Sequence, residues 1–474
     1  MLLAFAVALT TAHALAALVI TAYSASQLHL LVRSLRVPDP RVPPVPDELP
    51  AVTVQLPIRN EASVVADLLA SVGRLDWPRD RLLVQVLDDS DDETTTICAA
   101  ALEALERDGI RVEHVRRPVR QGFKAGALRD GLATAEGPYV AILDADFRPH
   151  PDFLRRTVPL LHAHPDVALV QARWGHINRD ASVYTRAQAL HLDAHFTVEQ
   201  RARSHRPLLM GFNGTAGVWR REAIDAAGGW SSDTLTEDLD LAFRAQLGGW
   251  NVLYVDAVEA PAELPADVRA IRTQQHRWMK GGAQVARKLL GALWRSDTPL
   301  LGKVQGTVHL LGGAVFLAVV VLLLATPALG PLQVAVPQLA TWTRPALTGL
   351  STALVVLLAF YGTTAVRRDG PAGMLRLARD FLPFLSLSTG LAVHDSVAVL
   401  EGWAGQESPF VRTPKVGSAG IARYTAAGAG PIVIGELALA AWGLLGLLWA
   451  LSTGNVVLAA FLASQTLGCA AVAL

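Results

Sequence analysis

The chain has 474 residues, with 42 Lys and Arg against 42 Asp and Glu, and therefore no formal net charge at pH 7. Of these 84 charged residues only 14 lie outside residues 33–303, so the centre is about 26% charged and the two ends together about 7%. This distribution excludes a wholly soluble protein, and the balanced charge gives no support for nucleic-acid binding. Cys98 and Cys469 are too few for a disulfide framework.

The N-terminal segment is apolar enough to cross a membrane. Residues 1–32 contain no charged side chain, and the run Leu2–Ile20 matches the ~20 residues that a spanning helix needs. Positive charge follows this run, at Arg33 and Arg36, whereas a secretory signal carries it in front. The pattern predicts a retained anchor with its N-terminus outside and the following domain in the cytoplasm. Residues 33–50 are proline-rich and are expected to be a stiff linker.

Residues 51–303 alternate short apolar runs with segments of helical periodicity. Strands are expected at 51–58, 82–87, 111–115 and 139–143, and helices at 61–72, 94–105, from 125, and at 240–247. Apolar strands alternating with helices predict an α/β domain with a mostly parallel sheet. Ligands of such sheets bind at the carboxyl ends of the strands.

Further apolar runs follow this domain, at 308–324, 346–366, 431–450 and 455–474. The run 381–400 is interrupted by His394 and Asp395, and is expected to lie along the membrane interface. The prediction is therefore five spans, with two at 304–366, interfacial helices and a loop at 367–430, and two at 431–474. Glu436 in the fourth span could face a polar cavity or be a solvated helix cap.

Acidic pairs stand at two of the expected strand ends. Asp88-Asp89 follows the second strand, and Asp144-Ala145-Asp146 follows a later one. Carboxylates placed in this way can hold a divalent cation together with a diphosphate, although acidic residues also end strands as simple turn formers. The chain has no P-loop and no GxGxxG, so ATP phosphoryl transfer and dinucleotide redox chemistry lose their usual signals.

Four other motifs carry groups suited to an anionic or sugar ligand. Lys124 stands between glycines at an expected helix start, where backbone N–H groups favour an anion. Phe212–Thr215 and Thr236–Asp238 are loop and helix-start motifs, the second of which could equally be an ordinary cap. Gln274–Trp278 joins a guanidinium that can bind phosphate to a flat indole, or anchors a helix at a membrane interface.

Taken in chain order, these motifs resemble those of the membrane-integrated inverting glycosyltransferases of family 2, the group that includes cellulose, mannan and hyaluronan synthases. The resemblance covers most of the chain and implies a GT-A type nucleotide-sugar-binding domain, with a Rossmann-like sheet, inserted between transmembrane helices. Phe410–Lys415 resembles the gating loop of cellulose synthases. Asn213 and Arg412 depart from the usual cellulose-synthase residues, which argues against a cellulose product.

The resemblance also implies residue roles on the donor side. Asp88 or Asp89 would contact the base, Lys124 the diphosphate, and Arg277 would stabilise the leaving group. Asp144 and Asp146 would hold Mg²⁺ or Mn²⁺. The implied donor-binding residues are Asp88, Asp89, Lys124, Asp144, Gln274 and Arg277.

On the acceptor side, the resemblance implies that Asp238 is the general base that takes the proton of the attacking hydroxyl. The implied acceptor-binding residues are Phe212, Asn213, Gly214, Glu237 and Trp278. The implied gating residues are Phe410, Thr413 and Lys415.

The expected function is inverting transfer of a hexose from a nucleotide sugar, of UDP-glucose or GDP-mannose type, to a growing β-linked polysaccharide. The reaction is expected at the cytoplasmic face of the plasma or inner membrane, coupled to export, with an export partner left unidentified. One alternative is the transfer of a single sugar to a membrane lipid. A second is a membrane transporter or scaffold whose cytoplasmic domain only binds nucleotide, which five spans without paired repeats disfavour.

Overall fold

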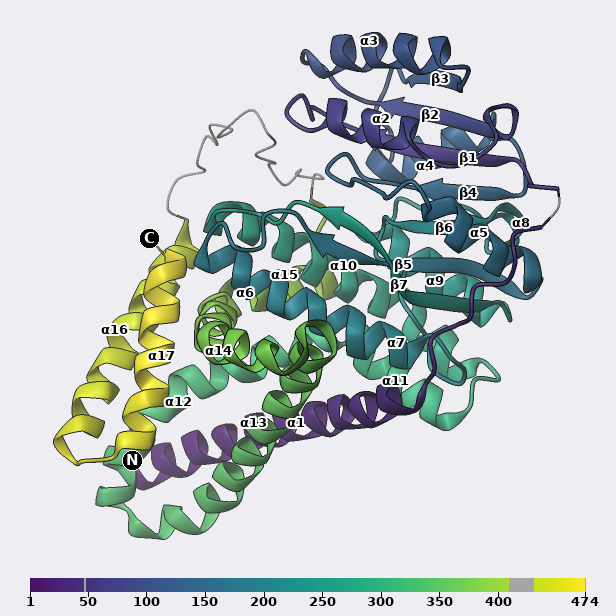
Figure 1. The fold of residues 1–474 in the computed structure, drawn as a ribbon. Helices are drawn as coiled ribbons and strands as arrows, with labels where there is room; N and C mark the ends of the chain where they lie inside the picture. The colour runs from purple at the N-terminus through teal and green to yellow at the C-terminus, as the bar shows by residue number, and fades with distance from the viewer. Residues whose placement is uncertain (47, 409–429, 474) are drawn as a thin grey trace.

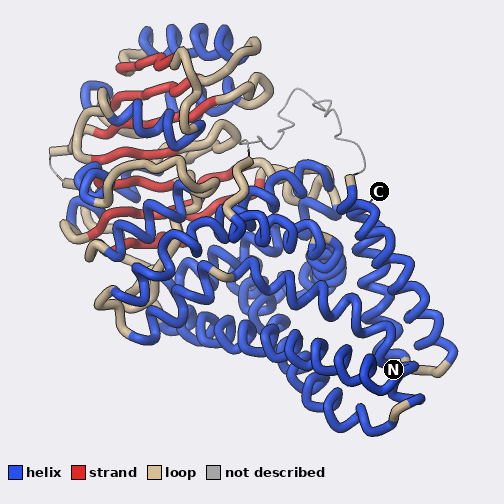
Figure 2. The backbone as a smooth tube through the Cα atoms, turned by 180° about the vertical axis from the view of Figure 1, so that it is seen from behind, coloured by secondary structure: helices blue, strands red, loops and turns tan. Residues whose placement is uncertain are grey.

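A computed structural model describes residues 1–46, 48–408 and 430–473. A sheet with its covering helices forms one end of the molecule and long helices form the other (Figures 1 and 2). The expected gating motif Phe410–Lys415 lies outside the described residues, so Phe410, Thr413 and Lys415 are not placed.

The sheet has seven strands in the order β3-β2-β1-β4-β6-β5-β7. The pairs β1–β2, β1–β4, β2–β3 and β5–β7 are parallel, while β6 runs antiparallel to both of its neighbours. The predicted mostly parallel sheet is therefore confirmed. The strands are β1 (Val52–Ile58), β2 (Leu82–Asp88), β3 (Arg111–Arg116), β4 (Tyr139–Ile142), β5 (Val167–His176), β6 (Gly217–Arg220) and β7 (Asn251–Ala262).

Apolar cores lie on both faces of the sheet. Successive strand residues point to opposite faces, so Tyr139 and Ala141 join one core while Val140 and Ile142 join the other. The first core packs against α2, α3 and α5, and the second against α4, α8 and α9. These helices are α2 (Val65–Gly73), α3 (Thr94–Arg107), α4 (Phe123–Leu132), α5 (Phe153–Ala163), α8 (Arg221–Ala226) and α9 (Glu237–Leu247).

A second group of helices connects the sheet to the long apolar helices. α6 (Val183–Ala194) continues into a π-helix, η2 (His195–Gln200), and a short α7 (Arg201–Arg203). α10 (Val268–Arg295) packs along α15 (Ala392–Ala404). α11 (Leu300–Leu310) follows α10.

Among the residues that the structure describes, five helical segments are long and apolar enough to cross a membrane. They comprise α1 (Leu2–Arg36), α12 (Val315–Ala335, preceded by a 3-10 turn), α13 (Ala340–Asp369) with α14 (Gly373–Gly390), α16 (Pro431–Ser452) and α17 (Val456–Ala473). α1 packs against α12 and α13, and α16 against α17 (Figure 1). The third segment, Pro337–Gly390, includes part of the region expected at the interface, whose interfacial placement stays a prediction.

Several boundaries differ from the expected ones for local reasons. The helix expected from residue 61 begins at Val65, because Glu61 forms a turn in which its carbonyl accepts from the N–H groups of Val64 and Val65. The apolar run at 308–324 does not form one helix, because α11 ends at Leu310 shortly before Gly312 and Gly313, and α12 begins at Val315. β5, β6 and β7 were not among the expected strands.

Glu436 is not a solvated cap. Its side chain is fully buried, and one carboxylate oxygen lies 2.8 Å from Nη1 of Arg272 on α10. Arg272 also donates to the carbonyl of Val472. The helix that carries the Gln274–Trp278 motif is therefore tied to α16 by a buried ion pair and to α17 by a hydrogen bond.

Candidate active site

A cleft lies where the carboxyl ends of β1, β2 and β4 meet the starts of α4 and α9 and the side of α10. Parallel strands present these ends at one edge of the sheet, which explains why distant motifs converge. Gln274, Arg277 and Trp278 reach it from one face of α10, because positions three and four apart are neighbours on a helix. The predicted site residues that line the cleft are Asp89, Lys124, Asp144, Asp146, Asn213, Gly214, Glu237, Asp238, Gln274, Arg277 and Trp278.

Lys124 is held in the cleft by an acid and a carbonyl. Its ammonium Nζ lies 2.6 Å from Oδ1 of Asp144 and donates to the carbonyl of Gly214 at 3.0 Å. Glu237 Oε1 is 3.9 Å from the same nitrogen. Burial alone lowers the pKa of Lys124, but the charges of Asp144 and Glu237 outweigh it and raise the pKa. The cleft therefore contains a fixed positive charge beside its carboxylates.

Asp238 lies in the first turn of α9, and its Oδ1 accepts from the N–H of Leu239 at 2.8 Å. Burial, and then the neighbouring charge of Glu237, raise the pKa of Asp238 to about 7, against the opposing effect of Lys124. Burial also raises the pKa of Glu237. A carboxyl group whose pKa is near neutral is suited to accept and release a proton at physiological pH.

Gly214 is required beside Asp238. Its φ is +79°, a left-handed conformation that favours glycine, and an added Cβ would lie 2.7 Å from Oδ2 of Asp238. The Gly214→Ala substitution is therefore expected to push the Asp238 carboxylate out of place and to reduce any activity of the site at least tenfold. The measurement is activity of the folded variant, verified by its unfolding temperature. Gly229→Ala is the matched control, because its φ is also positive but a Cβ there meets no atom within 4 Å.

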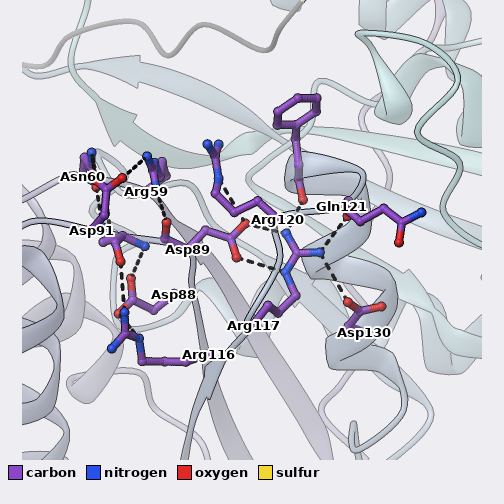
Figure 3. A network of polar contacts seen from close by, with 12 residues as sticks. Arg59, Asn60, Asp88, Asp89, Asp91, Arg116, Arg117, Arg120, Gln121 and Asp130 are labelled. Atoms are coloured by element: carbon purple, nitrogen blue, oxygen red, sulfur yellow. Dashed lines mark hydrogen bonds and ion pairs between the residues drawn. The ribbon is translucent and has the colours of Figure 1, made fainter.

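The two residues of the Asp88-Asp89 pair lie in different places: Asp88 is buried and Asp89 lines the cleft. The Asp88 side chain is fully buried and does not line the cleft; it pairs with His114 at 3.0 Å and accepts from the N–H of Ser90 at 2.8 Å. Asp89 lines the cleft, where Arg117 binds both its oxygens, at 3.0 and 2.5 Å (Figure 3). Of the two residues expected at the nucleotide base, Asp89 alone is placed to contact a ligand in the cleft.

Arg59 and Arg120 also line the cleft and were not identified from the sequence. Arg59 pairs with Asp91 at 2.6 Å and donates to the carbonyl of Asp89, and Arg120 lies 3.9 Å from Asp89 (Figure 3). Both follow the carboxyl ends of parallel strands, Arg59 after β1 and Arg120 after β3, and this position in the sequence could have identified them as cleft residues. These guanidinium groups make this part of the cleft suited to an anionic, hydrogen-bonding ligand.

A second cavity adjoins the cleft and extends toward the apolar helices. The two share Trp174, Leu192, Asn213, Thr236, Asp238 and Trp278. The second cavity continues to Tyr23 of α1 and Phe316 of α12. Phe212 lines only this cavity, and it is otherwise buried edge-on against Trp219. Asp238 therefore lies at the junction between a charged cleft and a cavity with aromatic walls.

The residues present fit a divalent cation that also binds a diphosphate. Asp144 and Asp146 both line the cleft, and carboxylate oxygens are ligands that Mg²⁺ and Mn²⁺ accept. Within the described ranges, no group of three or more His, Cys, Asp and Glu side chains is arranged as a cage for a metal ion. Two carboxylates with ligand oxygens completing the coordination are typical of phosphate-bound magnesium.

Comparisons with known proteins define the class of this domain. Residues 139–366 match the sequence family described as "Glycosyl transferase family group 2". The mannosyltransferase PcManGT of Pyrobaculum calidifontis, solved in complex with GDP-Man and Mn²⁺, superposes with a TM-score of 0.53 and 26% identity, covering 80% of this chain and 99% of that one. Residues 139–366 thus match family 2 glycosyltransferases, the sheet with its helices has a GT-A-like fold, and the apolar helices fit membrane integration.

Plant glucomannan mannosyltransferases are among the curated proteins similar to this chain. Glucomannan 4-beta-mannosyltransferase 1 of Oryza sativa subsp. japonica is 45% identical over 275 residues, which are 56% of this chain and 53% of that protein. Glucomannan 4-beta-mannosyltransferase 7 of Arabidopsis thaliana is 44% identical over 258 residues, 54% of this chain and 46% of that protein. The chain spans about half the length of the curated relatives it matches.

Proposed function

We propose that this protein is an inverting β-mannan synthase that transfers mannosyl units from GDP-mannose to a growing β-linked polysaccharide. The observation that carries the proposal is the place of Asp238, between the charged cleft with Lys124 and Asp144 and the second cavity with Trp278. The names of the relatives support mannose as the sugar, and the ligand of PcManGT supports the guanosine donor.

In the proposed reaction a hydroxyl of the acceptor sugar attacks the anomeric carbon of the donor. The bond from that carbon to the phosphate oxygen breaks as the new glycosidic bond forms, so an α-linked donor yields a β-linked product. The hydroxyl proton passes to the carboxylate of Asp238, and the electron pair leaves with GDP. Lys124 and Arg277 supply fixed positive charge where negative charge develops on the diphosphate.

Asp144 and Asp146 are the residues proposed to hold a divalent cation, which would supply further charge neutralisation for the diphosphate. Removal of divalent cations by a chelator is therefore expected to abolish transfer, and Mn²⁺ or Mg²⁺ to restore it. The measurement is GDP release by the purified full chain, and Ca²⁺ addition serves as a comparison of cation size. Full activity in excess chelator would contradict the metal assignment.

The proposed base also sets a pH dependence. A carboxyl group accepts a proton only when it is ionised, and the pKa of Asp238 is about 7. Below that pH the rate is expected to fall, approaching about tenfold for each pH unit. The measurement is the initial rate of transfer between pH 5.5 and 8.5 at saturating donor. A rate that stays constant down to pH 5.5 would contradict Asp238 as the base.

The catalytic domain is proposed to face the cytoplasm, where nucleotide sugars are made, and the second cavity to receive the growing chain on its way across the membrane. The test is synthesis by the full chain in nanodiscs, given GDP-mannose or UDP-glucose, with analysis of product length and of digestion by a β-mannanase. The expected product is a long mannanase-sensitive polymer from GDP-mannose. Products limited to single-sugar lipids, or made only from UDP-glucose, would overturn the proposal.

A further inference from the structure

The π-helix η2, His195–Gln200, lies beside the acceptor end of the site. π-helices are rare and are found frequently at functional sites. His195, Glu199 and Gln200 line the second cavity, together with Asn213 and Asp238 at its junction with the cleft. None of the three η2 residues belongs to the motifs on which the proposed function rests.

Glu199 is the centre of a partly buried polar cluster. Its Oε2 accepts from Nη1 of Arg203 at 2.8 Å and lies 3.0 Å from Nδ1 of His195. Its Oε1 accepts from Nε2 of Gln27, on α1, at 2.9 Å. Burial raises the pKa of Glu199, but Arg203 and His195 outweigh burial and hold the pKa well below its usual range. Glu199 is therefore a carboxylate and can only accept hydrogen bonds.

The orientation of Asn213 follows from fixed partners on both sides. Gln200 Nε2 donates to the carbonyl of Gly211 at 2.9 Å, which fixes the nitrogen end of the Gln200 amide. The same nitrogen donates to Oδ1 of Asn213, so the amide nitrogen of Asn213 must be the atom that faces His195. Asn213 Nδ2 lies 3.0 Å from Nε2 of His195, which therefore acts as the acceptor.

These contacts select one tautomer of His195. Because Nε2 accepts from Asn213, the ring proton is on Nδ1 and is donated to the Glu199 carboxylate. An asparagine amide has two N–H donors and an oxygen with two lone pairs. Within the described residues, His195 and Gln200 engage one of each, so one N–H and one lone pair of Asn213 remain for a ligand at the junction.

We propose that His195, Glu199 and Gln200 are positioning residues that hold the Asn213 amide toward a hydroxyl of the acceptor sugar, next to the hydroxyl that Asp238 deprotonates. The proposal rests on the proposed function and deepens it, because it assigns the recognition of the acceptor's terminal sugar. A sugar hydroxyl both donates and accepts hydrogen bonds, which matches the free N–H and lone pair of Asn213. The contact from Gln27 to Glu199 also links this recognition to the first membrane helix.

The test compares two substitutions of His195 in the full chain in nanodiscs, with a soluble β-manno-oligosaccharide as acceptor. His195→Phe keeps the ring size but leaves the Asn213 N–H without its acceptor, and is expected to raise the acceptor KM about tenfold, as expected for one misplaced hydrogen bond. His195→Gln can offer a carbonyl oxygen near the position of Nε2 and is expected to restore KM to within about threefold of wild type. Donor KM and donor hydrolysis without acceptor are expected to stay within about twofold of wild type.

Thr197→Val is the matched control on the same π-helix, since the Thr197 hydroxyl is buried with no hydrogen-bond partner in the described part of the chain. In the Asn213→Ala background, His195→Phe is expected to add nothing, because its effect passes through Asn213. If His195→Phe does not fold, His195→Asn replaces it, since it also lacks an acceptor at the Nε2 position.

The inference would be overturned by an unchanged acceptor KM in His195→Phe, or by an equal loss of donor hydrolysis and of transfer in that variant. An additive double mutant would also overturn it. These outcomes differ from failure of the proposed function, in which the wild-type protein itself transfers no mannose to the acceptor.

Discussion

Asp238→Asn is expected to lower the rate of mannosyl transfer by about 10²–10⁴, the usual contribution of a positioned general base. The amide keeps the size of the carboxylate but has no site that takes a proton at neutral pH. Donor binding is expected to remain, because the groups proposed to hold the diphosphate, Lys124 and Arg277, are unchanged. The measurements are kcat for transfer and the Kd for GDP.

Stability provides the control for this substitution. Since the pKa of Asp238 is about 7 when folded and near 3.8 when unfolded, the folded protein binds the proton more tightly. The charged carboxyl therefore lowers the stability of the fold increasingly as pH rises from about 4 through 7. Asp238→Asn removes this penalty and is expected to raise the unfolding temperature at pH 8. An inactive variant of lowered stability would indicate damage to the fold, and full activity would contradict the base assignment.

The parts of the fold that were predictable are those that local patterns determine. β1 to β4 are short apolar runs between helical segments. Lys124 and Asp238 stand at helix starts and were expected at the site from the family resemblance, whereas the rule that ligands meet the carboxyl ends of parallel strands brought Asp89 and Asp144 together. The Asp88-Asp89 pair shows the limit of such a rule. Neighbouring strand residues point to opposite sides, so Asp88 is buried while only Asp89 reaches the cleft.

Other features depend on contacts that no local pattern contains. Arg272 and Glu436 are 164 residues apart in the chain, on α10 and α16, and they meet only in the folded protein. Asn213 lies in the loop after η2 and α7, so its contacts with His195 and Gln200, 18 and 13 residues away in the chain, arise only from the folded arrangement. The roles of Gln274, Trp278 and the gating residues stay predictions.

Lys124→Met is expected to have two separable effects. The first is a loss of about 10²–10³ in kcat. Among the described residues, Lys124 carries the only ammonium shown to contact Asp144, and without it this positive charge would no longer stabilise the leaving diphosphate. Lys303→Met is the matched control, since Lys303 lies on α11 and is not among the residues that line the cleft. The measurements are kcat and the donor KM at pH 8, for both variants and for Lys124→Arg.

The second effect concerns the proton acceptor. The charge of Lys124 lowers the pKa of Asp238 and that of Glu237, so its removal raises both pKa values. The carboxylates of Asp144, Glu237 and Asp238 then lie together without the ammonium of Lys124. The acidic limb of the pH–rate profile is therefore expected to move to higher pH in Lys124→Met, while Lys124→Arg, which keeps the charge, retains the wild-type limb. If kcat falls but the limb does not move, Lys124 acts on the leaving group alone, and the group that titrates in the profile is not the carboxyl of Asp238.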